Sequence, residues 1–497
     1  MCKPFKIGEN DILGRYLVAT RPIKAGEIIL KEQPLIWGPS QITAPVCLGC
    51  GKILQQNFCI ACRKCGWPMC SEKCQESKAH FPECVYTQQK GSRIVVSNFV
   101  FPHPNYQCLT ILRILFQKEN DAKLWEKLMK LESHCKERKE TEKYENDRVS
   151  VAQFIRKFFK LEEKFTEEEI LRICGILQVN GHEIPLTEPP YVAIYEQTSM
   201  FEHNCKANCC KSFTSDGEIL ITAGVPIEFG EHLNICYTDS LWGTSNRRHY
   251  LAETKFFNCM CARCSDPTEF GTYFSAVKCQ NIDCKGYVLP DSFLVDPKKD
   301  YDQTWKCNIC DKKLTSNAIQ NIMDRIGRDL NAMQKGDWKS CQIFLDYYQK
   351  LLHHNHYYLT DVRLALGQLI GQHTEDGLNS IPEDAVDLKM KLCAQVTELV
   401  KILNPAEVRV RGTLLFELHA AVAEMAKRRA TSGEADSTEL RAMLLHSKAI
   451  LEEAVELLKH EPAELPEGKI HLQAMKNLTE MENLLRQVHI SIGDSIL

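Results

Sequence analysis

The chain has 497 residues, too many for one hydrophobic core, so we expect three or more domains. Its 44% hydrophobic and 8% aromatic content is typical of a globular protein and excludes a disordered one. The 61 basic and 65 acidic residues give a net charge of −4, which argues against binding nucleic acid through bulk charge.

The cysteine count bears on the compartment. The sequence contains 25 cysteines, and its N-terminal segment is polar without the pattern of a secretory signal peptide. No apolar run approaches the length of a membrane span, so we expect no membrane association. We therefore expect an intracellular, reducing location, cytoplasmic or nuclear, where closely spaced cysteines bind metal more often than they form disulfides.

Short strands are expected at the start of the chain, over residues 5–36. The apolar run 28–30 is typical of a buried strand, and Gly14 and Gly26 mark turns. A cysteine-rich segment at residues 47–84 then interrupts the strand pattern.

The segment 47–84 carries eight zinc-ligand residues in four close pairs. Zinc takes four thiolate or imidazole ligands, and two ligands with only two or three residues between them can come from one turn, so the segment can close two structural sites. Such a module folds on metal and recognises a partner rather than catalysing a reaction. The expected ligands are Cys47, Cys50, Cys62, Cys65, Cys70, Cys74, His80 and Cys84.

Cys59 offers an alternative to this ligand set. It could pair with Cys62 and leave Cys65 spare. We prefer Cys62 and Cys65, because the segment 65–70 then joins two ligand pairs through a tight turn.

The middle of the chain changes character twice. Residues 105–170 show helical periodicity between many Lys and Glu side chains, and within them residues 136–147 are almost all charged. We expect 136–147 to be a solvated helix end or loop. Strand-like sequence returns over 174–237, with buried runs at 219–221 and 234–237.

A second cysteine cluster lies just beyond these strands. It supplies three ligands within six residues, and the fourth ligand must come from elsewhere in the fold. The three ligands are Cys259, Cys261 and Cys264, and the candidates for the fourth are Cys205, Cys209 and Cys210.

A third cluster consists of two cysteine pairs separated by a 22-residue loop. This spacing is typical of a zinc ribbon. The expected ligands are Cys279, Cys284, Cys307 and Cys310.

The C-terminal region, residues 317–497, has helical periodicity almost throughout. Antiparallel helix pairs with short turns are typical of a tetratricopeptide-like array, although no strict repeat is present. The amphipathic stretches are 339–352, 384–403, 407–428, 438–459 and 469–486.

The order of these motifs along the chain resembles that of the SMYD family. Members of this family are lysine methyltransferases whose SET domain is split by a MYND zinc finger. Residues 12–19 are similar to the family's opening glycine turn, with Tyr16 in place of its second glycine. The segment 201–208 is similar to the Asn-His-Ser-Cys-x-Pro-Asn signature, 230–237 to the Gly-Glu-Glu-Leu…Tyr segment, and 178–181 to a strand whose asparagine touches the cofactor.

Three further features look most like the arthropod branch of the family. They are the Gly-Trp-Pro-Met-Cys turn at 66–70, the cysteine module at 279–310 and the segment 352–357.

The resemblance implies an α+β multidomain fold. It predicts a β-rich SET domain in two parts, split by the zinc finger and a helical insert, and followed by a post-SET zinc site, a zinc-ribbon-like module and a tetratricopeptide-like helical domain. The expected boundaries are 1–46 and 171–247 for the SET parts, 47–84 for the MYND finger, 85–170 for the insert, 248–270 for the post-SET site, 271–316 for the ribbon-like module and 317–497 for the helical domain.

The resemblance also implies an S-adenosylmethionine-dependent protein-lysine N-methyltransferase that acts on histone or non-histone proteins in transcriptional regulation. A sulfonium methyl moves to a neutral amine by in-line displacement, so the protein has to orient and desolvate the reactants. Tyr237 would line the lysine channel as the catalytic residue, and Cys205 would complete the post-SET site, for about four zinc ions per chain. The cofactor would be held by Gly14, Arg15, Tyr16, Asn180, Glu202, His203 and Phe257.

Two residues depart from the family pattern near the cofactor. Glu202 replaces an asparagine and Lys255 replaces a tyrosine; Asn204 and Ala207 also replace the serine and proline of the signature. Because a lone buried charge is costly, we expect Glu202 and Lys255 to pair with each other. The alternative is that Lys255 points to solvent.

These departures leave a second function open. The chain could be a non-catalytic or weakly active interaction protein that binds peptides, such as proline-rich ones, through the MYND finger and a partner through the helical domain. For either function we expect a monomer that does not bind nucleic acid directly.

Overall fold

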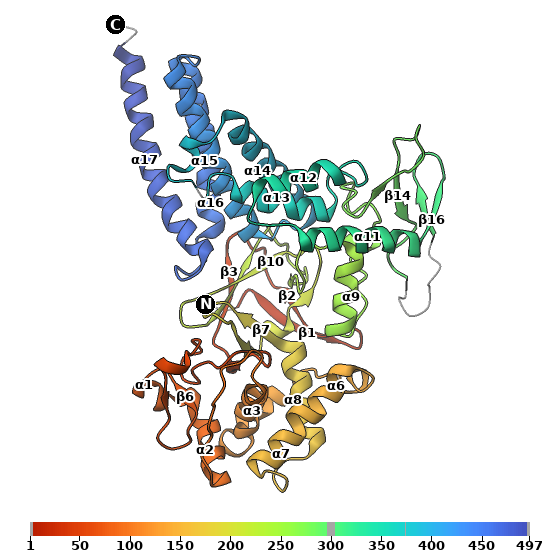
Figure 1. Ribbon diagram of the computed structural model, residues 1–497, viewed down its shortest axis with the longest axis vertical. Helices are drawn as coiled ribbons and strands as arrows, with labels where there is room; N and C mark the ends of the chain where they lie inside the picture. The colour runs from red at the N-terminus through yellow and green to blue at the C-terminus, as the bar shows by residue number, and fades with distance from the viewer. Residues whose placement is uncertain (1–2, 296–303, 373, 495–497) are drawn as a thin grey trace.

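The computed structural model describes residues 3–295, 304–372 and 374–494. Small β-sheets occupy the middle of the molecule, the cysteine-rich segment and the first helices lie at one end, and the C-terminal helices lie at the other (Figure 1). Within the described residues, no helix combines the length and apolar character needed to cross a bilayer.

The chain opens with a hairpin of β1 (Phe5–Asn10) and β2 (Gly14–Ala19). The side chain of Asn10 shapes its turn, because its Oδ1 accepts the backbone N–H groups of Ile12 and Leu13 at 3.0 and 2.7 Å. Gly14 ends the turn at φ 64°, a left-handed conformation that favours glycine.

The other strands of the central region pair across long stretches of sequence. The core between them contains Leu17, Ile29, Phe201, Ile221 and Leu233. One antiparallel sheet has the order β10 (Cys209–Phe213), β11 (Ile219–Ala223), β3 (Ile28–Glu32); a second has the order β4 (Ile36–Pro39), β8 (Tyr191–Ile194), β7 (Gly181–Ile184); and β9 (Glu202–His203) pairs in parallel with β12 (Asn234–Ile235).

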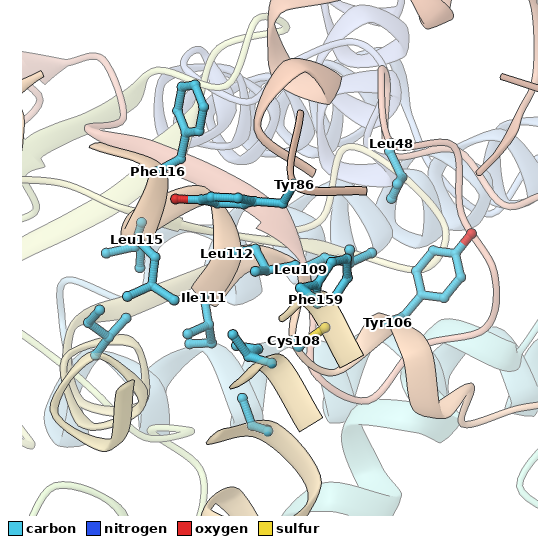
Figure 2. Close-up of a cluster of buried hydrophobic side chains, with 14 of the residues drawn as sticks. Leu48, Tyr86, Tyr106, Cys108, Leu109, Ile111, Leu112, Leu115, Phe116 and Phe159 are labelled. Atoms are coloured by element: carbon cyan, nitrogen blue, oxygen red, sulfur yellow. The ribbon is translucent and has the colours of Figure 1, made fainter. Parts of the chain in front are cut away.

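The zinc-finger segment and the helical insert share one hydrophobic core. Helix α2 (Phe81–Lys90) of the finger packs on α3 (Leu109–Asn120) of the insert. The rings of Tyr86 and Phe116 meet edge to face at 5.8 Å, above Leu112 (Figure 2). The finger is therefore fastened to the insert by apolar packing as well as by its ligands.

The insert contains several short helices and one long one. Most of the segment 136–147 is exposed, as expected for a solvated helix end, but Arg138 and Asp147 are both buried and form an ion pair at 2.6 Å. The helices are α4 (Ala122–Met129), α5 (Cys135–Arg138), α6 (Glu142–Asp147), a π-helical turn at Arg148–Gln153, α7 (Phe154–Phe159) and α8 (Glu167–Asn180).

Helix α8 also corrects the expected strand at 178–181. Thr166 caps its N-terminus by accepting the N–H of Glu169, and three glutamates in the first turn complement the helix dipole. The helix runs to Asn180 and passes directly into β7. Its apolar run 170–177 is buried on most sides, so sequence pattern alone could not separate a buried helix from a strand.

The C-terminal half begins with a four-stranded antiparallel meander that packs on the first helices. From α12 onward, each helix packs against the next, as expected for helical hairpins. The strands are β13 (Val277–Lys278), β14 (Tyr287–Pro290), β15 (Thr304–Cys307) and β16 (Lys313–Thr315); the helices are α11 (Ser316–Ala332), α12 (Trp338–Tyr348), α13 (Tyr357–Leu369), α14 (Glu383–Leu403), α15 (Val408–Ser432), α16 (Ser437–Leu458) and α17 (Pro466–Asp494).

Candidate functional site

The structure gathers the expected cysteines and histidine into four clusters, each with all its ligand atoms within 4.8 Å of one another. Tetrahedral zinc with bonds of about 2.3 Å separates its sulfur ligands by about 3.8 Å. The sulfur pairs here lie 3.5 to 3.9 Å apart, so the donor sets fit zinc. The clusters are Cys47, Cys50, Cys70 and Cys74; Cys62, Cys65, His80 and Cys84; Cys205, Cys259, Cys261 and Cys264; and Cys279, Cys284, Cys307 and Cys310.

The two clusters of the finger interleave along the chain. The first and third ligand pairs make one site, and the second and fourth make the other. Cys59 belongs to neither, since its thiol donates to the carbonyl of Gln56 at 3.6 Å. The structure thus agrees with the preference for Cys62 and Cys65.

The second finger cluster has a buried acidic partner behind its histidine. His80 Nε2 lies 3.3 Å from Cys65 Sγ, while His80 Nδ1 faces Glu83 Oε1 at 3.2 Å. Arg113 of α3 donates to both carboxylate oxygens of Glu83, at 2.8 and 3.2 Å. A carboxylate behind a zinc-binding histidine holds the ring orientation and tautomer. Arg113 therefore links the insert to a zinc ligand through Glu83.

The fourth ligand of the cluster after the SET strands is Cys205. Its Sγ lies 3.9 Å from that of Cys259 and 3.6 Å from that of Cys264. The two other candidates lie elsewhere: Cys209 Sγ is 3.3 Å from Asn208 Oδ1, and Cys210 Sγ is 2.9 Å from Thr222 Oγ1.

The charges around the Cys205 cluster also fit a zinc tetrathiolate, which is a dianion. Arg247 and Arg263 are fully buried and share a single carboxylate, Glu269, at 3.0 and 3.1 Å. One carboxylate does not balance two guanidinium groups. Within the described part of the chain, Arg247 Nε and Arg263 Nη2 have no hydrogen-bond partner, and Arg247 Nη2 lies 3.9 Å from Cys264 Sγ. A dianionic zinc tetrathiolate would supply the missing negative charge.

The fourth cluster has the tight turns of a zinc ribbon. Backbone N–H groups of Gly286 and Ile309 point at the sulfurs of Cys284 and Cys307, at 3.3 and 3.4 Å. Such donors stabilise thiolates. A side chain at Gly286 would place Cβ only 2.5 Å from Cys307 Sγ, so the turn requires glycine.

Tyr237 stands beside the zinc cluster of Cys205, and His203 connects the two. The backbone N–H of Tyr237 donates to His203 Nδ1 at 3.0 Å, which leaves Nε2 to face Cys205 Sγ at 3.2 Å. Both ring nitrogens of His203 are thus engaged. Its ring lies 5.2 Å from that of Tyr237 and 5.8 Å from that of Phe257.

The hydroxyl of Tyr237 donates to the carbonyl of Phe201, which holds the phenol in place. Burial, and secondarily the carboxylate of Glu202, raise the pKa of Tyr237 above its ordinary value. The phenol is therefore protonated at neutral pH and remains a hydrogen-bond donor.

The expected pairing of Glu202 with Lys255 is wrong. Glu202 Oε2 meets His232 Nδ1 at 2.5 Å, and the ring of His232 stacks on that of Tyr16 at 4.5 Å. The Tyr16 ring lies over Gly8 on the partner strand, where a Cβ would come within 2.7 Å of it. Tyr16 and Glu202, both departures from the family pattern, thus contact the same histidine.

Lys255 points inward instead of toward solvent. Its Nζ donates to the carbonyl of Val179 at 2.7 Å and lies 5.8 Å from the centre of the Tyr237 ring. Burial, and then repulsion from Lys211, lower the pKa of Lys255 to about 8. The ammonium is satisfied by backbone carbonyl oxygens at the end of α8, not by a carboxylate.

Asn180 and Arg15 both hydrogen-bond to a loop at residues 130–134 that we did not expect at the site. Asn180 Nδ2 donates to the carbonyl of Glu132 at 2.8 Å, and Arg15 donates to that of Lys130 at 2.8 Å. The carboxylate of Glu132 folds the loop by accepting the N–H groups of Ser133 and His134. Sequence reasoning missed the loop at 130–134 because it lies within a charged helical pattern, and only the fold reveals its position.

Tyr237 also lines a cleft of about 700 Å³ between strands β10 and β12 and helices α13, α15 and α17. Four acidic and two basic side chains line it, so acidic groups are in excess. Burial raises the pKa of Glu407 and lowers that of Lys211. The charged lining residues are Lys211, Asp239, Glu407, Arg409, Glu417 and Glu467.

Comparison with known proteins agrees with these features. The model of the SET domain family matches residues 14–238. The chain is 28% identical over 337 residues to the SET domain-containing protein SmydA-8, isoform A, of Drosophila melanogaster, covering 64% of this chain and 69% of the relative. It is 26% identical over 272 residues to histone-lysine N-methyltransferase SMYD3 of Mus musculus, covering 50% and 59%, and 25% identical over 296 residues to histone-lysine N-methyltransferase ASHR1 of Arabidopsis thaliana, covering 56% and 59%.

Proposed function

Because the chain belongs to the SET and MYND family of SET-domain proteins, we propose that it is an S-adenosylmethionine-dependent protein-lysine N-methyltransferase. The position of Tyr237 carries the proposal. This residue packs against His203, whose ring also lies 5.8 Å from that of Phe257, and it lines the 700 Å³ cleft. A catalytic tyrosine must stand between a cofactor and an incoming amine, and Tyr237 has two faces suited to that task.

The residues near Tyr237 suit two parts of the cofactor. The faces of His203 and Phe257 offer aromatic surface to an adenine ring. The amide of Asn180 is oriented by its bonds to the Glu132 and Ile176 carbonyls, which turns Oδ1 away from them as an acceptor for an ammonium group. A Cβ added to Gly14 would meet nothing within 4 Å, so the hairpin turn has open space above it.

S-adenosylmethionine, when bound, supplies an electrophilic methyl group on a sulfonium. The protein then has to orient and desolvate the acceptor amine. The Phe201 carbonyl holds the Tyr237 hydroxyl, and the raised pKa of Tyr237 keeps that hydroxyl protonated. Tyr237 therefore acts as an aromatic wall and a hydroxyl dipole rather than as a base.

The acceptor would be a lysine on a histone or non-histone protein, entering by the cleft that Tyr237 lines. The acidic excess of that cleft suits a basic segment around the target lysine. Such substrates agree with a cytoplasmic or nuclear location and a role in transcriptional regulation.

We also infer that the finger docks a short, proline-rich peptide. Strands β5 (Ile60–Ala61) and β6 (Pro68–Met69) form a two-stranded ribbon with open edges. Phe58, just before it, is 80% exposed, and Ile60 within it is 38% exposed.

A non-catalytic role is the second candidate function, and the charge of Lys255 favours it. An ammonium beside Tyr237 stands where the family pattern has an uncharged tyrosine, and it opposes a sulfonium. In this case the finger and the helical region would bind partners without methyl transfer.

Tritiated S-adenosylmethionine, incubated with the full-length zinc-loaded protein and core histones or a methylation-depleted lysate, tests the proposal. We expect label in protein, and a loss of at least about tenfold in turnover for Tyr237→Phe with cofactor binding retained. If the protein binds the cofactor and labels nothing, the non-catalytic role stands.

A further inference from the structure

Lys255 is the departure from the family pattern that places a positive charge beside Tyr237. Its Nζ is held by the carbonyls of Val179 and Gln178, at 2.7 and 3.4 Å, at the end of α8. From there it lies 5.8 Å from the centre of the Tyr237 ring. These contacts hold the ammonium near the Tyr237 ring.

Among the described residues, no carboxylate forms an ion pair with Lys255. Lys211 of β10 repels it, and His182 of β7 is kept neutral because burial, Lys211 and Lys255 all lower the pKa of its imidazole. Glu202, the carboxylate that we expected to pair with Lys255, instead contacts His232, with 2.5 Å between Glu202 Oε2 and His232 Nδ1. Backbone carbonyls satisfy the hydrogen bonds of Lys255 but leave its charge uncompensated.

A positive charge in this position affects the two forms of the cofactor differently. S-adenosylmethionine and S-adenosylhomocysteine share their adenosine and amino-acid parts, and differ by one methyl group and one positive charge on sulfur. Any attraction of Lys255 for the shared carboxylate cancels when the two are compared. The repulsion between the ammonium and the sulfonium remains.

We propose that Lys255 makes this pocket select S-adenosylhomocysteine, the neutral thioether form, over S-adenosylmethionine, the sulfonium form. The inference rests on the proposed function, which sets the reacting sulfur beside Tyr237. A chain with such a preference remains bound to its demethylated product, so the supply and removal of that product control its turnover.

The pH dependence gives an independent signature. The pKa of Lys255 is lowered to about 8, so the residue is mainly charged at pH 7 and mainly neutral at pH 9. The preference for the thioether is therefore present below about pH 8 and lost above it. By reciprocity, binding of the sulfonium form should lower the pKa of Lys255 further.

Calorimetric titration of the full-length, zinc-loaded protein with each cofactor form, at pH 7 and pH 9, tests the proposal. We expect S-adenosylhomocysteine to bind at least about tenfold more tightly at pH 7, with the ratio falling toward one at pH 9. Lys255→Met should abolish both the preference and its pH dependence. Lys255→Arg should keep the preference at both pH values, because a guanidinium does not titrate in this range.

Lys157→Met is the matched control, since Lys157 is an exposed lysine of α7 in the helical insert. It removes one charge without changing the pocket, and should leave the ratio as in the unmodified protein. Zinc content and melting temperature verify that each variant is folded. If Lys255→Met fails to fold, the ratio of the two affinities at pH 7 and pH 9 in the unmodified protein and in Lys255→Arg still tests the proposal.

Two results would overturn the inference, and they differ. If both forms bind with the same ratio in the unmodified protein and in Lys255→Met, Lys255 does not discriminate, while the proposed function stands. If neither form binds the unmodified protein at either pH, both the inference and the proposed function fail.

Discussion

Glu202 Oε2 lies 2.5 Å from His232 Nδ1, and this contact replaces the expected partnership between Glu202 and Lys255. The His232 ring also stacks on Tyr16 at 4.5 Å. Tyr16 and Glu202, two departures from the family pattern, therefore contact the same histidine, and Lys255 pairs with no carboxylate of the described residues.

This arrangement predicts which pairs are energetically coupled. A double-mutant cycle with Glu202→Ala and His232→Ala should show a coupling of about 0.5–1 kcal/mol in stability, a modest value because His232 is 42% exposed. A cycle with Glu202→Ala and Lys255→Ala should be additive within about 0.5 kcal/mol. Chemical denaturation of the four variants of each cycle measures both, and strong coupling only in the second cycle would restore the pairing with Lys255.

Elemental analysis of the purified protein should find about four zinc ions per chain, one for each four-ligand cluster. Cys205→Ser should remove one ion and destabilise the region around Tyr237, since a structural site contributes folding free energy directly. Cys209→Ser and Cys59→Ser are the matched controls, and both should retain four ions. A loss of zinc from either control variant would contradict the assignment of the zinc ligands.

The acidic group behind His80 should tune its zinc site. Glu83→Gln should weaken zinc binding at that site by about 10- to 100-fold, because the carboxylate orients the imidazole and raises its basicity. Arg113→Met should cost about 3–5 kcal/mol of stability, since it leaves the Glu83 carboxylate buried without its cation. Chelator competition measures the first and chemical unfolding the second. If the double variant is as unstable as Arg113→Met alone, the stranded carboxylate is not the cause.

Glu461, close to the cleft, predicts a dependence of stability on pH. Burial raises its pKa from 4.5 to about 7, with Arg409 opposing and Glu467 and Glu407 adding to the shift, and its Oε2 has no hydrogen-bond partner in the described part of the chain. The folded state thus favours the protonated carboxyl. Its contribution to stability is fully present below about pH 4.5 and is lost as the pH rises through about 7.

Glu461→Gln should remove this loss. The variant should exceed the unmodified protein by about 2–3 kcal/mol at pH 8, and by much less at pH 5. Melting temperatures at the two pH values check the sign, with the exposed Glu464→Gln as the control. An equal effect of Glu461→Gln at both pH values would contradict the assignment.

The zinc ligands show how much of a metal site can be predicted from the spacing of residues in the sequence. Ligands a few residues apart come from a single turn, so their pairing is a property of the sequence, and Cys279, Cys284, Cys307 and Cys310 need only one hairpin meander to meet. The choice of Cys205 over Cys209 and Cys210 is different. Three thiols in one short segment are equivalent by spacing, and only the path of β9 into β10 decides which of them reaches the Cys259 cluster.

Secondary structure near the site was predicted less well, for a related reason. The run 170–177 is apolar on most positions, and a helix buried on all sides has no polar face to reveal its period. The loop at 130–134 could not be predicted, because the hydrogen bonds that bring it to Asn180 and Arg15 join residues 48 and 115 positions apart.

By itself, the sequence determined the chemistry available to this protein: closely spaced zinc-ligand residues, a SET-like order of motifs, Tyr237, and two charged residues where the family pattern has uncharged ones. The tertiary structure decided which charges meet. Ion pairing depends on distances between side chains on different elements, and the spacing of residues in the sequence does not give these distances. In the folded protein, Glu202 contacts His232, and Lys255 donates to backbone carbonyls at the end of α8. The resulting uncompensated charge beside Tyr237 exists only because of that folding.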